Sequence, residues 1–310
     1  MKVRDLSPAE FRRALAGPGL RLRTGLFNCR MQSEVAAIAP EMAQLYAHHE
    51  LLDDSSFIDF HIKISTGKGL RRWLRPQALF SVDEVLPFTP LPQNQALAMI
   101  EWGLNWCITA YSHHLLVLHA ASLAKGEHAL ILPAPPGSGK STLCAALANR
   151  GWRLLSDELT LIDLRDGRLH ALARPVNLKN NSIDVIRRFA PEAFLSAPVL
   201  DTTKGTVALM APNEASVQAQ TQPTWPRWMA LPRWQAGAAT RLTPMPPGEA
   251  FLQLADNAMN YHILGEQGFQ ALGQLIDRVE SFRFEYSDLN EAVALFDQLA
   301  SSAVNAVSSS

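Results

Sequence analysis

The sequence predicts an α/β fold with a mixed, largely antiparallel sheet, preceded by a smaller α+β region. Two observations predict this arrangement. Apolar runs of strand length alternate with helix-length segments after residue 112, and tight turns lie before and after the glycine-rich segment 134–139. Such short turns join neighbouring antiparallel strands. The sheet therefore differs from the parallel sheet that strict strand–helix alternation produces.

Length and composition set the limits of the prediction. A chain of 310 residues is long for a single core. We expect domains over 1–92 and 93–300 and a disordered tail over 301–310. The hydrophobic content of 47% and the charged content of 18% are ordinary for a folded protein. A net charge of −1 gives no reason to expect a nucleic acid or an anionic membrane as partner.

The terminus and the cysteines predict a cytoplasmic protein. The first residues lack the apolar core of a signal peptide. No apolar run is long enough to span a membrane as a helix. Cys29, Cys107 and Cys144 lie far apart in the sequence, so we expect reduced, packed thiols rather than disulfides or a zinc site.

Short elements fill the amino-terminal region. Ser7 is a typical residue at a helix start. Alternation of apolar and polar residues predicts strands, and apolar residues at steps of three and four predict a helix. We expect a helix over 8–16, strands over 20–26 and 57–64, a proline-bearing linker over 86–92, and a helix over 97–111.

The second region starts with a predicted hairpin. Its apolar strands, 115–121 and 129–132, flank the turn at Lys125-Gly126. The remaining elements follow from apolar runs, turn residues and helical periodicity. They are a helix over 140–149 ended by Gly151, a strand over 152–155 that 159–164 continues, a strand over 168–173, an irregular but packed segment over 223–247, helices over 250–260, 266–279 and 288–299, and a strand over 281–286.

The segment after the second hairpin strand has the composition of a phosphate-binding loop. Small residues allow backbone N–H groups to point at phosphate oxygens, a lysine adds positive charge, and a serine hydroxyl can bind Mg²⁺. A strand before the loop and a helix after it aim these groups at one point. The alternative is a glycine-rich turn with a surface lysine. Ala134 stands where the first glycine of such loops is usual. The predicted nucleotide-binding residues are Pro135, Pro136, Gly137, Ser138, Gly139, Lys140, Ser141 and Thr142.

Two carboxylates follow the loop by one helix and one strand. Asp157 and Glu158 stand at the end of an apolar run, where a phosphoryl-transfer site needs a metal ligand and a base. We expect Ser141, Asp157 and Glu158 at the metal. Adjacent side chains on a strand point to opposite faces, so one carboxylate acts directly unless the chain twists at Ser156. His119 lies in the preceding apolar run, either as a core residue or as a neighbour that tunes Asp157.

These residues resemble the HPr kinase/phosphorylase family, and more closely the HPr-kinase-related proteins (HprK-related kinase A) encoded beside peptide-modification genes. The resemblance covers residues 111 to 300, and the first region does not obviously match. The matching segments are Leu118-His-Ala-Ala-Ser-Leu123, Pro135-Pro-Gly-Ser-Gly-Lys-Ser-Thr142, Arg150-Gly-Trp-Arg-Leu-Leu-Ser-Asp-Glu158, Arg174-Pro-Val-Asn-Leu-Lys179, Thr202-Thr-Lys-Gly-Thr206 and Asn257-Ala-Met-Asn-Tyr-His262.

The resemblance implies a P-loop kinase domain of the HPr kinase and phosphoenolpyruvate carboxykinase type, with ATP and Mg²⁺ as cofactors. It implies that Lys140 contacts the phosphates, Asp157 takes the serine proton and His119 is the neighbour of Asp157. Glu158 stands where the family usually has a second aspartate. Arg174 and Lys204 are cations that suit the transferring group and a closing segment, respectively; otherwise they are ordinary surface bases.

The sequence thus predicts a Mg·ATP-dependent serine kinase. The expected acceptor is a serine of a small protein or of a ribosomally made precursor peptide, which the first domain would recognise, and family relatives suggest a homo-oligomer. Two alternatives stay open. One is a regulatory module that binds ATP without transfer, and the other is a small-molecule kinase that needs no peptide. The sequence does not distinguish ATP from GTP.

Overall fold

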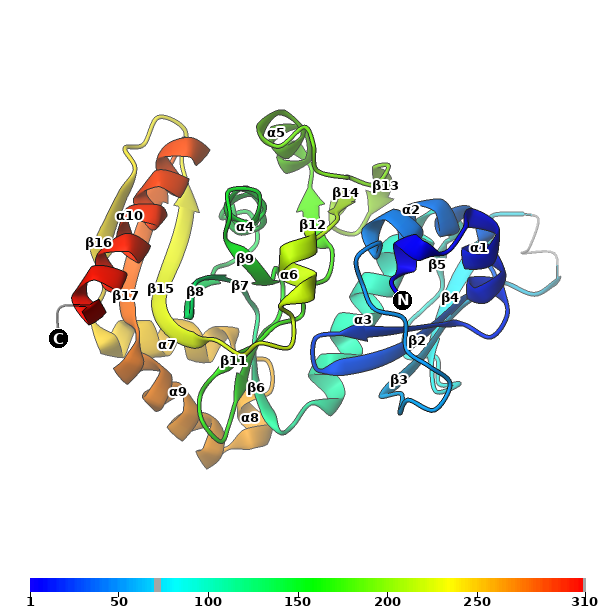
Figure 1. Ribbon diagram of the computed structural model, residues 1–310, viewed down its shortest axis with the longest axis horizontal. Coiled ribbons are helices and arrows are strands. Elements are labelled where there is room, and N and C mark those ends of the chain that lie inside the picture. Colours follow the sequence, from blue (N-terminus) through cyan, green and yellow to red (C-terminus); the bar gives the residue numbers. More distant parts are fainter. Residues whose placement is uncertain (70–73, 309–310) are drawn as a thin grey trace. The chain divides into compact units, whose positions relative to one another are not determined.

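The computed structural model of the protein describes residues 1–69 and 74–308. The chain forms two compact units (Figure 1). Unit 1 contains Met1–Tyr111, Leu172–Arg187 and Pro191–Thr221. Unit 2 contains Ser112–Ala171, Arg188–Ala190 and Gln222–Ser310.

Unit 1 combines a five-stranded sheet, ordered β1-β2-β3-β4-β5, with a three-stranded sheet, ordered β12-β14-β13. Short 3-10 helices cover Val3–Asp5, Ala36–Ile38 and Gln93–Gln95. The other elements are α1 (Pro8–Ala16), β1 (Leu20–Thr24), β2 (Phe27–Ser33), α2 (Ala39–Leu45), β3 (Phe60–Thr66), β4 (Gln77–Val82), β5 (Leu91–Pro92), α3 (Ala96–Tyr111), β12 (Val176–Lys179), α5 (Asn181–Phe189), β13 (Val199–Thr202), β14 (Gly205–Met210) and α6 (Glu214–Gln218).

Local sequence signals account for the first elements of unit 1. Ser7 caps α1, since its hydroxyl accepts from Glu10 N–H while the Glu10 carboxylate accepts from Ser7 N–H. β1 and β2 alternate buried and half-buried residues, as strands with one wet face do. The helix over 8–16 and the strands near 20–26 and 57–64 are therefore confirmed, the last shifted to Phe60–Thr66.

The helix α3 belongs to unit 1, because it packs on the sheet of that unit. Gly103 lies against the Phe80 ring of β4, so closely that a Cβ at residue 103 would fall 2.0 Å from the ring. The segment predicted as a linker, 86–92, ends in β5, which pairs with β4. Unit 1 therefore extends past the boundary expected at residue 92, and it also includes residues 172–187 and 191–221.

Unit 2 is built on a six-stranded sheet, ordered β16-β17-β15-β8-β7-β9, and a three-stranded sheet, ordered β11-β10-β6. Its elements are β6 (Leu115–Leu118), β7 (Ala120–Lys125), β8 (His128–Pro133), α4 (Lys140–Ala148), β9 (Arg153–Ser156), β10 (Thr160–Asp163), β11 (Leu169–His170), β15 (Trp225–Trp234), β16 (Arg241–Pro244), α7 (Pro247–Asn257), α8 (Tyr261–Leu264), α9 (Glu266–Arg278), β17 (Glu280–Tyr286) and α10 (Leu289–Ser308).

The six-stranded sheet is mixed, as predicted. β15 pairs in parallel with both β8 and β17, whereas the pairs β7–β8, β7–β9 and β16–β17 are antiparallel. The hairpin of β7 and β8 turns at Gly126, whose φ of 60° is a conformation that glycine adopts easily. β7 lies between β8 and β9 in the sheet and is antiparallel to both. β8 and β9 are the strands that lead to the candidate site residues.

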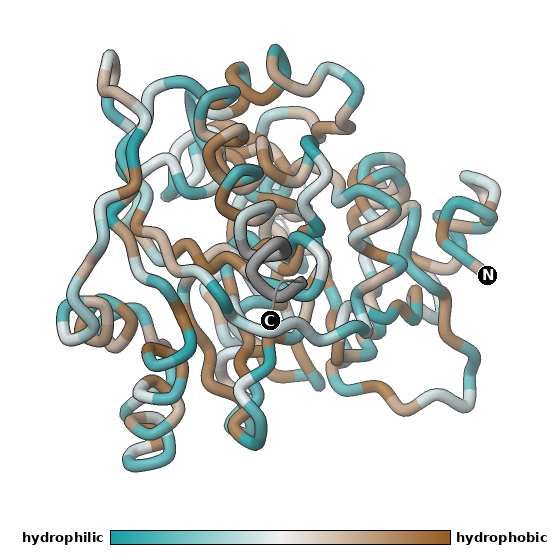
Figure 2. The backbone as a smooth tube through the Cα atoms, turned by 60° about the vertical axis from the view of Figure 1, so that its left-hand side comes forward, coloured by the Kyte–Doolittle hydropathy of each residue, from teal (hydrophilic) through white to brown (hydrophobic). Residues whose placement is uncertain are grey.

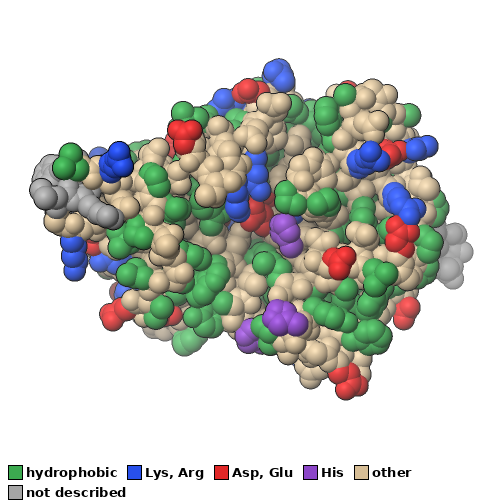
Figure 3. All heavy atoms as spheres, turned by 180° about the vertical axis from the view of Figure 1, so that it is seen from behind, with side chains coloured by type: hydrophobic (Ala, Val, Ile, Leu, Met, Phe, Trp, Pro, Cys, Tyr) green, Lys and Arg blue, Asp and Glu red, His purple; other side chains and the backbone are tan. Residues whose placement is uncertain are grey.

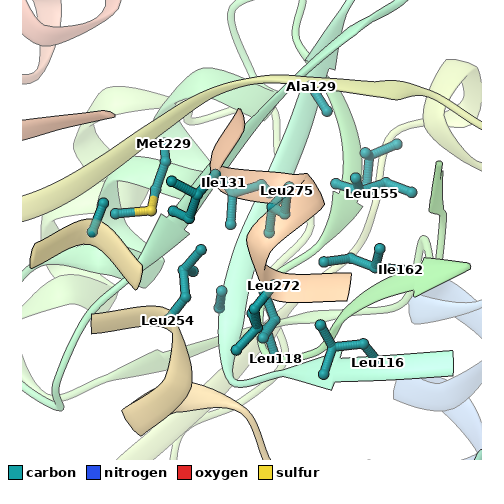
Figure 4. Packing of buried hydrophobic residues seen from close by; sticks show 14 of the residues in the cluster. Leu116, Leu118, Ala129, Ile131, Leu155, Ile162, Met229, Leu254, Leu272 and Leu275 are labelled. Atoms are coloured by element: carbon teal, nitrogen blue, oxygen red, sulfur yellow. The ribbon is translucent and has the colours of Figure 1, made fainter. Parts of the chain in front are cut away.

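Helices cover both faces of this sheet. Residues of β8, β15, α7 and α9 share one buried cluster, which includes Ile131, Met229, Leu254 and Leu272 (Figure 4). On the other face Trp228 of β15 lies next to Trp152, and Trp152 contacts Phe296 of α10. Figure 2 shows helices that alternate between hydrophilic and hydrophobic positions along the chain, as expected for helices with one face on a core.

Three expectations for unit 2 need correction. The run 115–121 is not one strand, because β6 and β7 join different sheets on either side of His119. For the same reason β10 does not continue β9. The proline-bearing segment 223–247 is not irregular, since β15 alone runs over Trp225–Trp234.

The carboxyl-terminal helix is longer than predicted. The expected end was near Leu299, whereas α10 runs to Ser308 and takes in most of the segment 301–310 that we expected to be disordered. No helix within residues 1–69 and 74–308 is long and apolar enough to cross a membrane. On the face shown in Figure 3, side chains of both charge signs are interspersed.

Candidate active site

The predicted phosphate-binding loop connects β8 to α4, as the sequence indicates. Gly137 and Gly139 have φ values of 85° and 90°, which only glycine adopts without strain. Ala134 is buried and does not have a positive φ. The backbone at Ala134 therefore does not require glycine, and the replacement of the usual first glycine is compatible with the shape of the loop.

Residues at the ends of β15 and β17 donate hydrogen bonds to main-chain carbonyls of this loop. The Trp234 N–H at the end of β15 donates to the Ser138 carbonyl over 2.9 Å. The Tyr286 hydroxyl at the end of β17 donates to the Gly139 carbonyl over 3.0 Å. A Cβ on Gly139 would lie 2.4 Å from that hydroxyl, so residue 139 must also be small. Sequence reasoning missed Trp234 and Tyr286, because only the sheet order brings them to the loop.

The helix α4 begins directly after the loop. Its first-turn N–H groups have no partners within the helix, and the helix dipole adds partial positive charge at this end. The buried Ser138 hydroxyl has no hydrogen-bond partner among the described residues. These groups, with the left-handed glycines, form a cradle whose donors suit phosphate oxygens.

Lys140 is the first residue of α4 and is buried, with 8% of its surface exposed. Its Nζ lies 3.4 Å from Nε2 of His119. An ammonium group donates hydrogen bonds and accepts none, so this contact requires neutral His119 with its lone pair on Nε2. The contact between His119 and Asp157 that the sequence suggested stays a prediction.

The strand register brings His119, the loop and Asp157 to the same edge of the sheet. Ala120 at the start of β7 pairs with Pro133 at the end of β8. Ser122 pairs with Ser156 at the end of β9. Because β7 is antiparallel to both neighbours, the residue before β7 and the residues after β8 and β9 lie at one edge.

Asp157 and Glu158 stand in a bend rather than in the strand. β9 ends at Ser156, whose hydroxyl accepts from the Leu159 N–H over 3.1 Å and so closes the turn. Successive side chains point to opposite faces only within a strand, so Asp157 and Glu158 need not point in opposite directions. Asp157 is buried, with 4% exposed, and Glu158 is half-buried.

The thiol of Cys144 shows which helix Asp157 faces. The Cys144 thiol donates a long hydrogen bond of 3.9 Å to the Ser156 carbonyl, and burial together with the negative charge of Asp157 raises the pKa of this thiol. Cys144 follows Lys140 by four residues, so both lie on one face of α4. Asp157 therefore lies along the helix face that begins with Lys140.

The oxygen donors at this edge fit Mg²⁺. They are the Ser141 hydroxyl at the start of α4 and the carboxylates of Asp157 and Glu158. Mg²⁺ prefers oxygen ligands and usually takes only one or two carboxylates from the protein, with water and phosphate oxygens as its other ligands. Among the described residues, no three His, Cys, Asp or Glu side chains gather as a metal cluster. The donor set thus suits a Mg²⁺ ion that takes further ligands from outside the protein.

A segment far along the chain positions His119. The Asn257 carbonyl accepts from the His119 N–H over 2.7 Å. The buried Asn260 side chain accepts from Val117 N–H over 3.0 Å and donates to the Leu115 carbonyl over 2.8 Å. These residues belong to the Asn257–His262 segment, which the sequence marked through its resemblance alone. Its observed role is to hold β6 and the start of β7.

Arg174 and Lys204 belong to unit 1, whereas the loop, His119 and Asp157 belong to unit 2. Arg174 is buried, donates to the Asn105 side chain and lies 3.5 Å from the Glu101 carboxylate. The Lys204 Nζ lies 5.1 Å from the centre of the Trp102 ring. Arg174 is therefore not an ordinary exposed base. The roles of both residues toward a phosphoryl group stay predictions.

Comparison of the chain with known proteins gives structural similarity but no match in sequence. No protein-family model and no curated protein matches the chain. Among solved structures, the chain is similar to the HPr(Ser) kinase/phosphatase from Coxiella burnetii, with 12% identity over 62% of this chain and 98% of that chain, and a TM-score of 0.28. Because that score is low, the assignment of a mixed α/β architecture is based on the strand order of the structure and not on this neighbour.

Proposed function

We propose that the protein is a Mg·ATP-dependent kinase that transfers the γ-phosphoryl group to a serine of a small protein or a ribosomally made precursor peptide. One observation carries the proposal. The strand register gathers a phosphate-binding loop, a buried lysine and a buried carboxylate at one edge of the sheet in unit 2. Phosphoryl transfer needs these three elements for binding, charge neutralisation and proton removal.

The proposed reaction gives each residue a defined task. Asp157 accepts the proton of the acceptor serine, whose oxygen forms the new bond to the γ-phosphorus. The bond between that phosphorus and the bridging oxygen breaks, and ADP leaves with the electron pair. Lys140 and the loop N–H groups neutralise the negative charge that develops on the phosphates. Mg²⁺, when bound through Ser141 and the carboxylates, adds positive charge at the same oxygens.

His119 supports this arrangement through Lys140. Neutral His119 accepts a hydrogen bond from the ammonium group, and this contact fixes the direction of the lysine side chain. A fixed cation loses less entropy when it meets the phosphates than a free surface lysine does. We further propose that Arg174 and Lys204 contact the transferring group or the phosphates, that the protein is cytoplasmic, and that it is a homo-oligomer.

The proposal is tested with ATP labelled at the γ-phosphate, Mg²⁺ and a panel of peptides supplied in pairs that contain either serine or alanine at one position. We expect label on serine peptides only. Label that appears on small metabolites without peptide would favour a small-molecule kinase. ATP binding without any transfer would favour a regulatory module. Either result would contradict the proposed function.

A further inference from the structure

Trp234 is an exposed aromatic residue beside the phosphate-binding loop. It ends β15, and 52% of its surface is accessible. Its backbone N–H donates to Ser138 of the loop over 2.9 Å, and its indole Nε1 donates to the Ser287 carbonyl over 3.2 Å. Both ends of the residue are therefore fixed, and the indole extends from the loop toward the turn after β17.

The other tryptophans of β15 have partners for their rings. Trp228 is buried and has edge contacts with Trp152 and His128. Trp225 has the guanidinium groups of Arg168 and Arg278 at 4.7 and 5.3 Å from its ring centre. Within the part of the chain that the structure describes, no aromatic or cationic side chain stacks on Trp234. Since tryptophan is usually well buried, a fixed and exposed ring indicates a surface that a ligand covers.

The position of Trp234 relates this ring to the phosphates. A Cβ on Gly139 would lie 2.9 Å from the Trp234 Cβ, so the indole begins directly beside the loop backbone. β15 runs parallel to β8 up to the pair of Met229 with Ile131, and it continues past the end of β8, so Trp234 lies beside the loop that follows β8. A nucleotide whose phosphates occupy the loop carries its planar base within reach of such a neighbouring surface.

We propose that Trp234 is the stacking surface for the base of the nucleotide whose phosphates bind the loop. This inference rests on the proposed function, because it needs a nucleotide at that loop. Indole rings stack on the π face that every base presents, and this contact discriminates little between bases. The base-binding part of the site would therefore hold adenine or guanine through the same ring.

The experiment compares the affinities of two ligands by calorimetry. ATP carries a base, whereas inorganic tripolyphosphate offers phosphates alone. We expect Trp234→Ala to weaken ATP binding about ten-fold or more, as loss of a stacked base does, with tripolyphosphate binding unchanged. Trp234→Phe should retain most of the ATP affinity, since it keeps an aromatic face. Trp225→Ala, which removes another partly exposed tryptophan of the same strand, should change neither affinity.

Three results would overturn the inference. The first is ATP affinity that is unchanged in Trp234→Ala. The second is an equal loss of ATP and tripolyphosphate affinity in both Trp234 variants, which would show that the ring only shapes the loop. The third is a wild-type protein that binds neither ligand, and this result would overturn the proposed function as well.

Discussion

At the scale of single residues, the position of Asp157 depends on two neighbours that carry no charge. Ser156 closes the bend that takes Asp157 out of the strand, and its carbonyl accepts from the Cys144 thiol, whose pKa the negative charge of Asp157 raises. A carboxylate beside the helix that begins with Lys140 can accept a proton from a hydroxyl that binds nearby. The two small side chains thus border the candidate base.

A histidine in unit 1 makes stability depend on pH. Burial lowers the pKa of His49 from 6.5 to about 4, and its Nε2 lies 3.0 Å from the Ala173 carbonyl. The folded state holds His49 neutral, whereas the unfolded chain takes up a proton below pH 6.5. Its contribution to stability is therefore complete above pH 6.5 and is lost as the pH falls toward 4.

We expect the loss of the His49 contribution to lower the free energy of unfolding by about 2 kcal/mol between about pH 7 and pH 5. Urea unfolding across this range measures the effect. His49→Gln has no titrating ring, so its stability should vary less with pH than that of the wild type. Parallel pH profiles for the two proteins would contradict the assignment.

Residue-scale predictions from sequence were confirmed where the signal is local and structural. Ser7 was expected to open the first helix and Lys140 to begin the helix after the loop, and both do so, whereas the phosphate contacts of Lys140 and Gly139 stay predictions. Tyr286 and Trp234 could not be recognised, because they reach the loop from strands that lie far away in the sequence. Asn260 acts through main-chain groups of β6, which no residue pattern reveals.

At the scale of elements, β15 shows why a strand can be hidden in the sequence. Proline removes a ladder hydrogen bond and argues against a central strand. Here the register of β15 against β8 shifts between Pro226 and Trp228. Pro232 lies beyond Met229, the last residue of β15 that pairs with β8, although it still pairs with Phe284 of β17. The prolines therefore stand where the ladder to β8 is irregular or has ended, and the ladder to β17 continues the strand.

Helix packing provides a prediction with a built-in control. Gly103 lies in α3 against Phe80, whereas Gly273 lies in α9 with nothing within 4 Å of a Cβ built on it. Gly103→Ala should destabilise the protein by about 1–3 kcal/mol, because the methyl group overpacks this contact. Gly273→Ala should stabilise it by about 0.5–1 kcal/mol, since alanine is the better helix former.

Urea unfolding of the two variants tests this account of the α3 interface. Both substitutions add the same methyl group to a helix, so they differ in surroundings rather than in chemistry. If Gly103→Ala were as stabilising as Gly273→Ala, the close packing of α3 on β4 would be contradicted.

At the scale of the whole molecule, the chain passes between its two units several times. Unit 1 takes its three-stranded sheet from residues 176–210, although most of the unit precedes residue 112. Composition and linker signals can only divide the chain into consecutive segments, and the proline-bearing segment 86–92 therefore predicted a single boundary at residue 92. They could not predict that Arg174 contacts Glu101 and Asn105, since those residues belong to a helix some seventy positions earlier.

The central claim is that Asp157 removes the serine proton at a nucleotide site in unit 2. The most direct measurement compares single-turnover transfer from labelled ATP by the wild type and Asp157→Asn, together with the ATP affinity of each. Asp166→Asn, in the turn between β10 and β11, is the matched control for loss of one carboxylate. We expect transfer to fall about 10²–10⁴-fold in Asp157→Asn while ATP binding is retained, because a carboxamide cannot accept the proton. Transfer by Asp157→Asn at the wild-type rate would contradict the account.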